Sequence, residues 1–154
     1  ISVLYRKKHQ AYRRLVARSR EWAEQVPAVV PPAEADAIDR TLMENLGRLT
    51  DEEQIYLDPN LDLETLSQRM GVHRNMISKA VNTVHGKPFS AYINECRVRQ
   101  AILLLSDPAN DNLSLETIAF DSGFSNLSNF NRHFLRYRKS TPREYRERLR
   151  SARR

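Results

Sequence analysis

The sequence predicts an all-α protein in which two helix-turn-helix units are joined by a long connector helix and preceded by an amino-terminal helical extension. One observation is residues 123–134, where a glycine precedes a helical pattern with Phe130 and Phe134 four residues apart on one face. A second is that this pattern occurs twice in the chain. A third is the run between the copies, 89–106, whose apolar residues fall on two faces of a helix.

The repeat is visible in the residues themselves. Leu63-Glu64-Thr65-Leu66 and the later Gly71 match Leu115-Glu116-Thr117-Ile118 and the later Gly123. The offset is 52 residues up to the glycine and 53 after it. Two copies of a helix, a turn and a second helix predict one helix-turn-helix unit over 62–84 and another over 114–138.

Residues 1–26 are predicted to form one basic helix, because apolar residues follow a 3.5-residue spacing that only Lys8 and Ser19 interrupt. Three roles are open for it: a dimerising signalling helix, a juxtamembrane segment marked by the Arg6-Lys7-Lys8 cluster, or a helix packed on the domain. In the second case the full-length protein would be tethered to the inner membrane. Because the chain begins at Ile1 rather than Met, we expect it to be part of a larger or trimmed protein.

Three prolines in ten residues predict that 27–36 is a semi-extended linker rather than an uninterrupted helix. The main domain is then expected over 37–154, and it begins with a helix over about 37–49. That helix has an acidic surface and is predicted to brace the first unit. Its apolar stripe is Ile38, Leu42, Leu46 and Leu49.

In the first unit, Asp62 is the predicted N-cap of the helix that starts at Leu63. The second helix of that unit is expected over about 74–84, with Ile77 and Val81 pointing inward. The connector follows over 89–106, where Cys96 is expected to be a small core residue.

In the second unit, Ser114 is the predicted N-cap of the first helix. The final helix is predicted over 141–151, because Thr141-Pro142 is a capping residue followed by proline at the first helical position.

Charge is distributed unevenly along the chain. The formal net charge is +6, which the segments 1–25, 26–59 and 60–154 divide as +5, −6 and +7. Residues 127–154 alone hold ten basic and two acidic side chains, the footprint of a protein that binds a polyanion. Within that segment, 148–154 is expected to be a solvated basic tail.

Several classes of function find no support. One cysteine and four histidines without paired spacing predict no metal site, and four glycines are too few for a phosphate-binding loop. No catalytic residues, cofactor or small-molecule site are therefore predicted, and the chain is not expected to be an enzyme. No run approaches the ~20 apolar residues of a membrane-spanning helix. We expect a cytoplasmic protein.

The chain resembles the AraC/XylS family of bacterial transcription regulators over residues 58–149. The most specific part is Ser114-Leu115-Glu116-Thr117-Ile118-Ala119, then Gly123-Phe124-Ser125, Phe130, Arg132, Phe134, Thr141-Pro142 and Tyr145-Arg146. Lys139 departs from the pattern, since the family usually has glycine there to end the helix in a left-handed conformation.

The resemblance implies a sequence-specific, double-stranded DNA-binding domain that inserts two recognition helices into successive major grooves. It also implies activation through contact with RNA polymerase, and an effector-sensing region that is absent from this chain. Side chains at positions where family members contact bases are Asn75, Ser78, Lys79, Ser128, Asn131 and Arg132. These residue types can pair with base edges, Arg with guanine and Asn with adenine.

Phosphate contacts are expected from basic side chains and helix starts that border these positions. They are His73, Arg74, Lys87, Arg136, Arg138, Lys139, Thr141 and Arg143. The alternative is a non-specific nucleic-acid-binding or DNA-architectural module. An RNA-binding module would expose aromatic side chains for stacking, whereas the core is expected to need Phe124, Phe130 and Tyr145.

Overall fold

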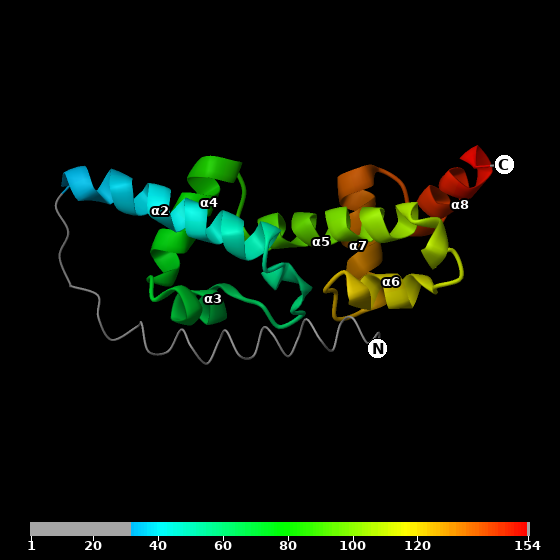
Figure 1. Ribbon diagram of the computed structural model, residues 1–154, viewed down its shortest axis with the longest axis horizontal. Coiled ribbons are helices and arrows are strands. Elements are labelled where there is room, and N and C mark those ends of the chain that lie inside the picture. The colour runs from blue at the N-terminus through cyan, green and yellow to red at the C-terminus, as the bar shows by residue number, and fades with distance from the viewer. Residues whose placement is uncertain (1–31, 154) are drawn as a thin grey trace. The chain divides into compact units, whose positions relative to one another are not determined.

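The computed structural model describes residues 32–153, with side chains from Arg40 onward. Seven α-helices and no strand are found in this part of the chain, which confirms the predicted all-α fold (Figure 1). The predicted helix 1–26 and residues 27–31 of the predicted linker lie outside the described residues. The helices divide between two compact units. The first combines residues 32–55 with Leu61–Tyr92, and the second combines Tyr56–Asn60 with residues 93–153.

Helix α2 covers Pro32–Asp51 and therefore begins inside the predicted linker. The prediction that 27–36 is extended is wrong for its last five residues. Proline is tolerated in the first turn of a helix, where its missing N–H has no helical partner, and the residues after Pro32 include strong helix formers. Leu42, Leu46 and Leu49 are buried, as the apolar stripe predicts.

The first unit is completed by α3 (Leu63–Met70) and α4 (Arg74–His85), which pack against each other, while α2 packs on α4. Asp62 is the N-cap of α3, and its carboxylate accepts a hydrogen bond from the Thr65 N–H at 2.7 Å. Hydrogen bonds from the backbone and the side chain of Thr65 are the main cause of the lowered pKa of Asp62. Gly71, with φ of 65°, ends α3 in the left-handed region.

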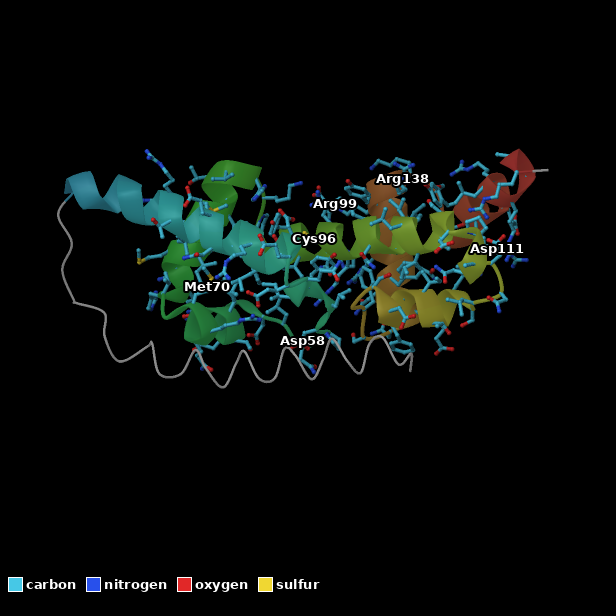
Figure 2. All side chains as sticks on the ribbon, viewed as in Figure 1. Asp58, Met70, Cys96, Arg99, Asp111 and Arg138 are labelled. Atoms are coloured by element: carbon cyan, nitrogen blue, oxygen red, sulfur yellow. The ribbon has the colours of Figure 1, made fainter. Side chains whose placement is uncertain are left out.

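Helix α5 covers Phe89–Ser106, the range predicted for the connector. Its first turn, through Tyr92, belongs to the first unit, and the remainder belongs to the second. Its buried apolar residues fall on two sides of the helix, Phe89, Tyr92, Ile93 and Cys96 on one and Val98, Ala101 and Leu105 on the other. Cys96, labelled in Figure 2, is buried, as predicted.

The second unit contains α6 (Leu115–Asp121), α7 (Leu127–Arg138) and α8 (Pro142–Ala152). Its core is built on aromatic rings. The ring of Phe130 lies 5.4 Å from that of Phe124 and 5.6 Å from that of Phe134, and the Phe134 ring lies 5.6 Å from that of Tyr145. Phe130 and Phe134 are fully buried. This packing fixes which face of α7 remains in contact with solvent.

Residues Tyr56–Asn60 are held against the second unit by a buried arginine that the sequence analysis missed. The Arg97 guanidinium donates to the backbone carbonyls of Tyr56 and Asp58, both at 2.7 Å. Gly123, with φ of 92°, passes so close to this segment that a Cβ would lie 2.2 Å from the Tyr56 carbonyl oxygen. Only glycine fits at this position.

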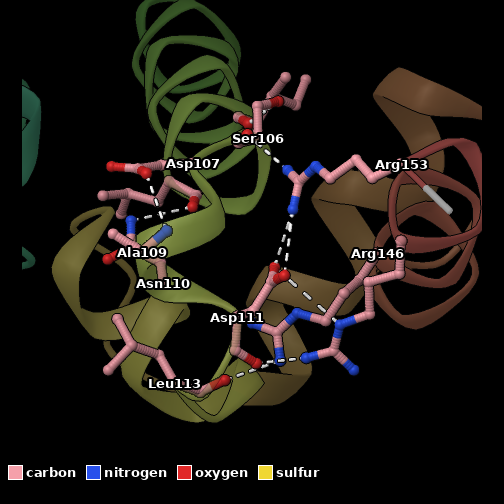
Figure 3. A network of polar contacts seen from close by, with 11 residues as sticks. Ser106, Asp107, Ala109, Asn110, Asp111, Leu113, Arg146 and Arg153 are labelled. Atoms are coloured by element: carbon pink, nitrogen blue, oxygen red, sulfur yellow. Dashed lines mark hydrogen bonds and ion pairs between the residues drawn. The ribbon is translucent and has the colours of Figure 1, made fainter.

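The carboxyl-terminal arginines are part of the fold, and the expectation of a solvated basic tail at 148–154 is wrong for 148–153. Figure 3 shows Arg146 donating to the Leu113 carbonyl at 2.7 Å and Arg153 donating to the Asp111 carboxylate at 3.1 Å. Arg150 also donates to the Asp111 carbonyl. Arg146 and Arg150 therefore bond carbonyl groups of the loop after α5, and Arg153, the C-cap of α8, bonds the Asp111 carboxylate, which anchors the last helix to the unit.

Lys139 ends α7 in the left-handed conformation that glycine usually takes, with φ of 57°. Its N–H donates to the Leu135 carbonyl at 2.8 Å, so the helix closes in the ordinary way despite the substitution. A non-glycine residue held in this region costs about 1 to 2 kcal/mol. The departure from the family pattern therefore changes the residue and not the backbone geometry.

Candidate nucleic-acid interface

In the first unit, α4 separates an apolar face from a polar one. Ile77, Ala80 and Val81 are buried against the rest of the unit. Asn75 and Lys79 are exposed, and Ser78 is half-buried beside them. The three predicted base-contacting side chains of this unit therefore lie on one helix, on or at the edge of its solvent face.

The start of α4 is fixed by His73. Its Nδ1 accepts a hydrogen bond from the Asn75 N–H at 3.2 Å, which makes His73 the N-cap of the helix. Because Nδ1 accepts, Nε2 carries the ring proton and remains able to donate. Arg74 is exposed next to it, 3.9 Å from the Glu64 carboxylate. The helix start combines the positive end of the helix dipole with the cation of Arg74, an arrangement suited to a phosphate.

In the second unit, α7 presents the equivalent face. Burial of Phe130 and Phe134 on one side leaves Ser128, Asn131 and Arg132 exposed on the other. The helix is positioned by Asn126, whose side-chain oxygen accepts from the Asn129 N–H at 2.8 Å. This cap was not predicted, although asparagine directly before an apolar helical pattern is a recognised helix-start signal.

Arg132 has a hydrogen-bond partner on its own helix. Its Nη2 donates to Asn129 Oδ1 at 3.0 Å and lies 3.5 Å from His133 Nε2. The His133 ring stacks on Phe124, with the ring centroids 6.0 Å apart. Burial, followed by the charges of Arg132, Arg136 and Arg97, lowers the pKa of His133. A neutral His133 therefore lies beside the Arg132 guanidinium at neutral pH.

The expected phosphate contacts differ in how accessible they are. Arg136, Arg138 and Lys139 are exposed on the last turn of α7, and Lys87 is half-buried after α4. Arg138, labelled in Figure 2, lies over the Tyr145 ring with its guanidinium carbon 5.1 Å from the ring centroid. This contact holds the arginine against the fold while leaving its charge at the surface.

The start of α8 suits a phosphate less well than the sequence predicts. The Thr141 hydroxyl accepts from the Glu144 N–H at 3.2 Å, and the Thr141 N–H donates to the Glu144 carboxylate at 2.8 Å. This capping box fills the helix start with a carboxylate, whose pKa the bonds from Thr141 lower. Arg143 is exposed there, with its Nε 3.2 Å from a Glu147 carboxylate oxygen.

Two other structural findings concern the described residues. No group of three or more His, Cys, Asp or Glu side chains in residues 40–153 could hold a metal ion. No helix within this part of the chain is long and apolar enough to cross a membrane.

Comparisons with known proteins agree with this geometry. A family described as "Helix-turn-helix domain" matches residues 66–148, which include most of both helix-turn-helix units. An uncharacterized HTH-type transcriptional regulator of Staphylococcus aureus strain MSSA476 is 26% identical over 103 residues. That alignment covers 67% of this chain and 13% of the relative, so the chain spans a small part of the curated proteins it matches.

Solved structures share the fold. The DNA-binding domain of AdpA, a global transcriptional factor solved in complex with a target DNA, is 25% identical with a TM-score of 0.62, covering 73% of this chain and 95% of that one. The carboxyl-terminal domain of the response regulator YesN from Fusobacterium nucleatum is 26% identical with a TM-score of 0.54, covering 73% and 98%. The chain belongs to the AraC-type helix-turn-helix family of DNA-binding transcription regulator domains, which is not a family of enzymes.

Proposed function

We propose that the chain recognises specific sequences in duplex DNA by inserting α4 and α7 into successive major grooves, and thereby controls transcription. One observation carries the proposal: in each unit, one side of the helix after the turn is buried, through Ile77 and Val81 in α4 and Phe130 and Phe134 in α7, and the other side exposes amide, hydroxyl and cationic groups. The match to AdpA, whose domain was solved with its target DNA, supports duplex DNA as the ligand.

Each exposed group has a matching base edge. Arg132 can donate two hydrogen bonds to guanine O6 and N7, and Lys79 can donate to the same acceptors. Asn75 and Asn131 can pair with the N6 and N7 edge of adenine, and Ser78 and Ser128 can bond to either type of edge. The hydrogen bond from Arg132 to Asn129 reduces the rotamer entropy that the arginine loses on binding.

Phosphate contacts are proposed for His73, which can donate through Nε2, and for the basic side chains around these helices. The basic side chains are Arg74, Lys87, Arg136, Arg138, Lys139 and Arg143. Thr141 is the weakest member of the predicted set, because the Glu144 carboxylate lies beside it, but its hydroxyl accepts from the Glu144 N–H and can still donate to a phosphate. Such contacts add affinity without sequence preference and make binding weaker as salt rises.

The form of the DNA site and the protein partners are proposed from the family resemblance. We propose that the DNA site is asymmetric, because one chain carries two unlike recognition helices. The two major-groove segments that they contact would lie about 34 Å apart along the duplex. Contact with RNA polymerase and dimerisation through residues 1–26 are proposals of the same kind.

Arg132→Ala tests base readout most directly. We expect it to cost ~1 to 3 kcal/mol on the preferred site and to relax the preference at one base pair, because a bidentate contact to guanine is lost. Arg136→Ala is the matched control, since it removes the same charge from an exposed position on the same helix. It should weaken matched and scrambled DNA about equally. Fluorescence anisotropy titrations on both duplexes measure the difference. Equal losses for the two variants on both DNAs would favour a non-specific nucleic-acid binder instead.

A further inference from the structure

Leu135 is an apolar side chain in the middle of the solvent face of α7. It lies three residues after Arg132 and four after Asn131, and therefore beside both on the helix surface. The fully buried Phe130 and Phe134 project from the opposite side. Leu135 is 47% exposed, so it adds an apolar surface to a face that is otherwise polar and basic.

The fold does not require leucine at this position. The core of the second unit consists of Val98, Ala101, Leu105, Ile118, Ala119, Phe124, Phe130 and Phe134. The partly buried side chains packed against that core come from α5, α6, α8 and the loop before α6, and Leu135 is not among them in the described part of the chain. Packing against the core therefore does not explain the leucine.

We propose that Leu135 contacts the C5-methyl group of a thymine in the second half of the DNA site, which makes it a specificity-determining residue. The inference rests on the proposed function. The floor of the major groove is polar except for the thymine methyl group, which is the feature that an apolar side chain can recognise. An exposed leucine next to Arg132 and Asn131 would reach base edges beside those that they contact.

The internal repeat shows what distinguishes the two units at this position. With the offset of 53 residues that holds after the glycine, Leu135 corresponds to Asn82 of α4, as Arg132 corresponds to Lys79. Asn82 is exposed, like Leu135, but it carries an amide. A hydrogen-bonding amide in one unit and an apolar group in the other give the two recognition helices different base preferences, which makes the site asymmetric.

The test replaces thymine by deoxyuridine, which removes only the methyl group. The purified chain is titrated against its selected duplex and against duplexes in which each thymine in turn is deoxyuridine. Burying one methyl group contributes about 0.8 kcal/mol, so affinity should fall about threefold to fivefold at one thymine close to the Arg132-dependent base pair. Leu135→Ala should bind the original duplex with that same reduced affinity and should no longer respond to the replacement.

Leu103→Ala is the matched control. Leu103 is 67% exposed on α5 in the same unit, and its removal should leave the deoxyuridine profile unchanged. Because Leu135 lies outside the core, the melting temperature of Leu135→Ala should match that of the parent chain, which separates a lost contact from a lost fold.

The possible results distinguish this inference from the proposed function. The Leu135 assignment fails if no replacement of thymine by deoxyuridine lowers the affinity of the parent chain, or if the replacement lowers the affinity of Leu135→Ala as much as that of the parent chain. Base readout by Arg132 still stands in either case if Arg132→Ala loses its base preference. If the parent chain prefers no sequence, both fail.

Discussion

Replacing Phe130 by alanine is expected to lower the free energy of unfolding by about 3 to 5 kcal/mol, because it empties the centre of the aromatic core of the second unit. The Phe130 ring is fully buried and contacts the rings of both Phe124 and Phe134. Cores are packed closely enough that a cavity of this size is not refilled completely. Thermal and urea unfolding followed by circular dichroism measure the loss.

Leu135→Ala is the control for this experiment, since it shortens an exposed side chain on the same helix and should change stability by less than about 1 kcal/mol. An unchanged melting temperature for Phe130→Ala would remove Phe130 from the core. It would then also remove the reason for assigning Ser128, Asn131 and Arg132 to the solvent face.

Gly123→Ala is expected to destabilise the chain by roughly 2 to 5 kcal/mol for two separate reasons. The backbone at Gly123 has φ of 92°, which non-glycine residues adopt at a cost of about 1 to 2 kcal/mol. The new Cβ would also lie 2.2 Å from the Tyr56 carbonyl oxygen. Because the obstacle is backbone, relief requires movement of the 56–60 segment that Arg97 holds, and such overpacking costs ~1 to 3 kcal/mol more.

Gly47→Ala is the matched control in the same unfolding measurement. A Cβ at Gly47 meets nothing within 4 Å, and the residue lies inside α2. Alanine is the better helix former there by about 0.5 to 1 kcal/mol, so the control should be slightly more stable than the parent chain. If Gly123→Ala were as stable as Gly47→Ala, the 56–60 segment could not pass beside Gly123 as described.

Local patterns predicted the helices well because each depends on nearby residues. The connector has the predicted bounds, and the caps at Asp62, Ser114 and Thr141 form as predicted. The start of α2 was misplaced because prolines are compatible with a first helical turn as well as with a linker.

Long-range contacts could not be predicted in the same way. Arg97 reads as an ordinary polar residue on a helix, and its burial depends on carbonyl groups about forty residues earlier in the chain. Arg150 and Arg153 read as a basic tail because Asp111, their partner, is also distant in sequence.

The sequence was sufficient to predict which side of each recognition helix faces solvent, but not which hydrogen bonds the side chains there form. Helical periodicity places Phe130 and Phe134 opposite Arg132, whichever fold surrounds them. The hydrogen bond between Arg132 and Asn129 depends on a rotamer choice, and the bonds that occupy Thr141 depend on the competing carboxylate of Glu144. Neither is encoded in residue type alone.

Selection of preferred sites from a random duplex DNA pool, at two salt concentrations, tests sequence-specific recognition by two helices most directly. We expect two unlike blocks of enriched bases about one helical turn apart, with weaker binding at the higher salt because phosphate contacts release counterions. Recovery of bound DNA with no enriched sequence at either salt concentration would contradict base readout by α4 and α7.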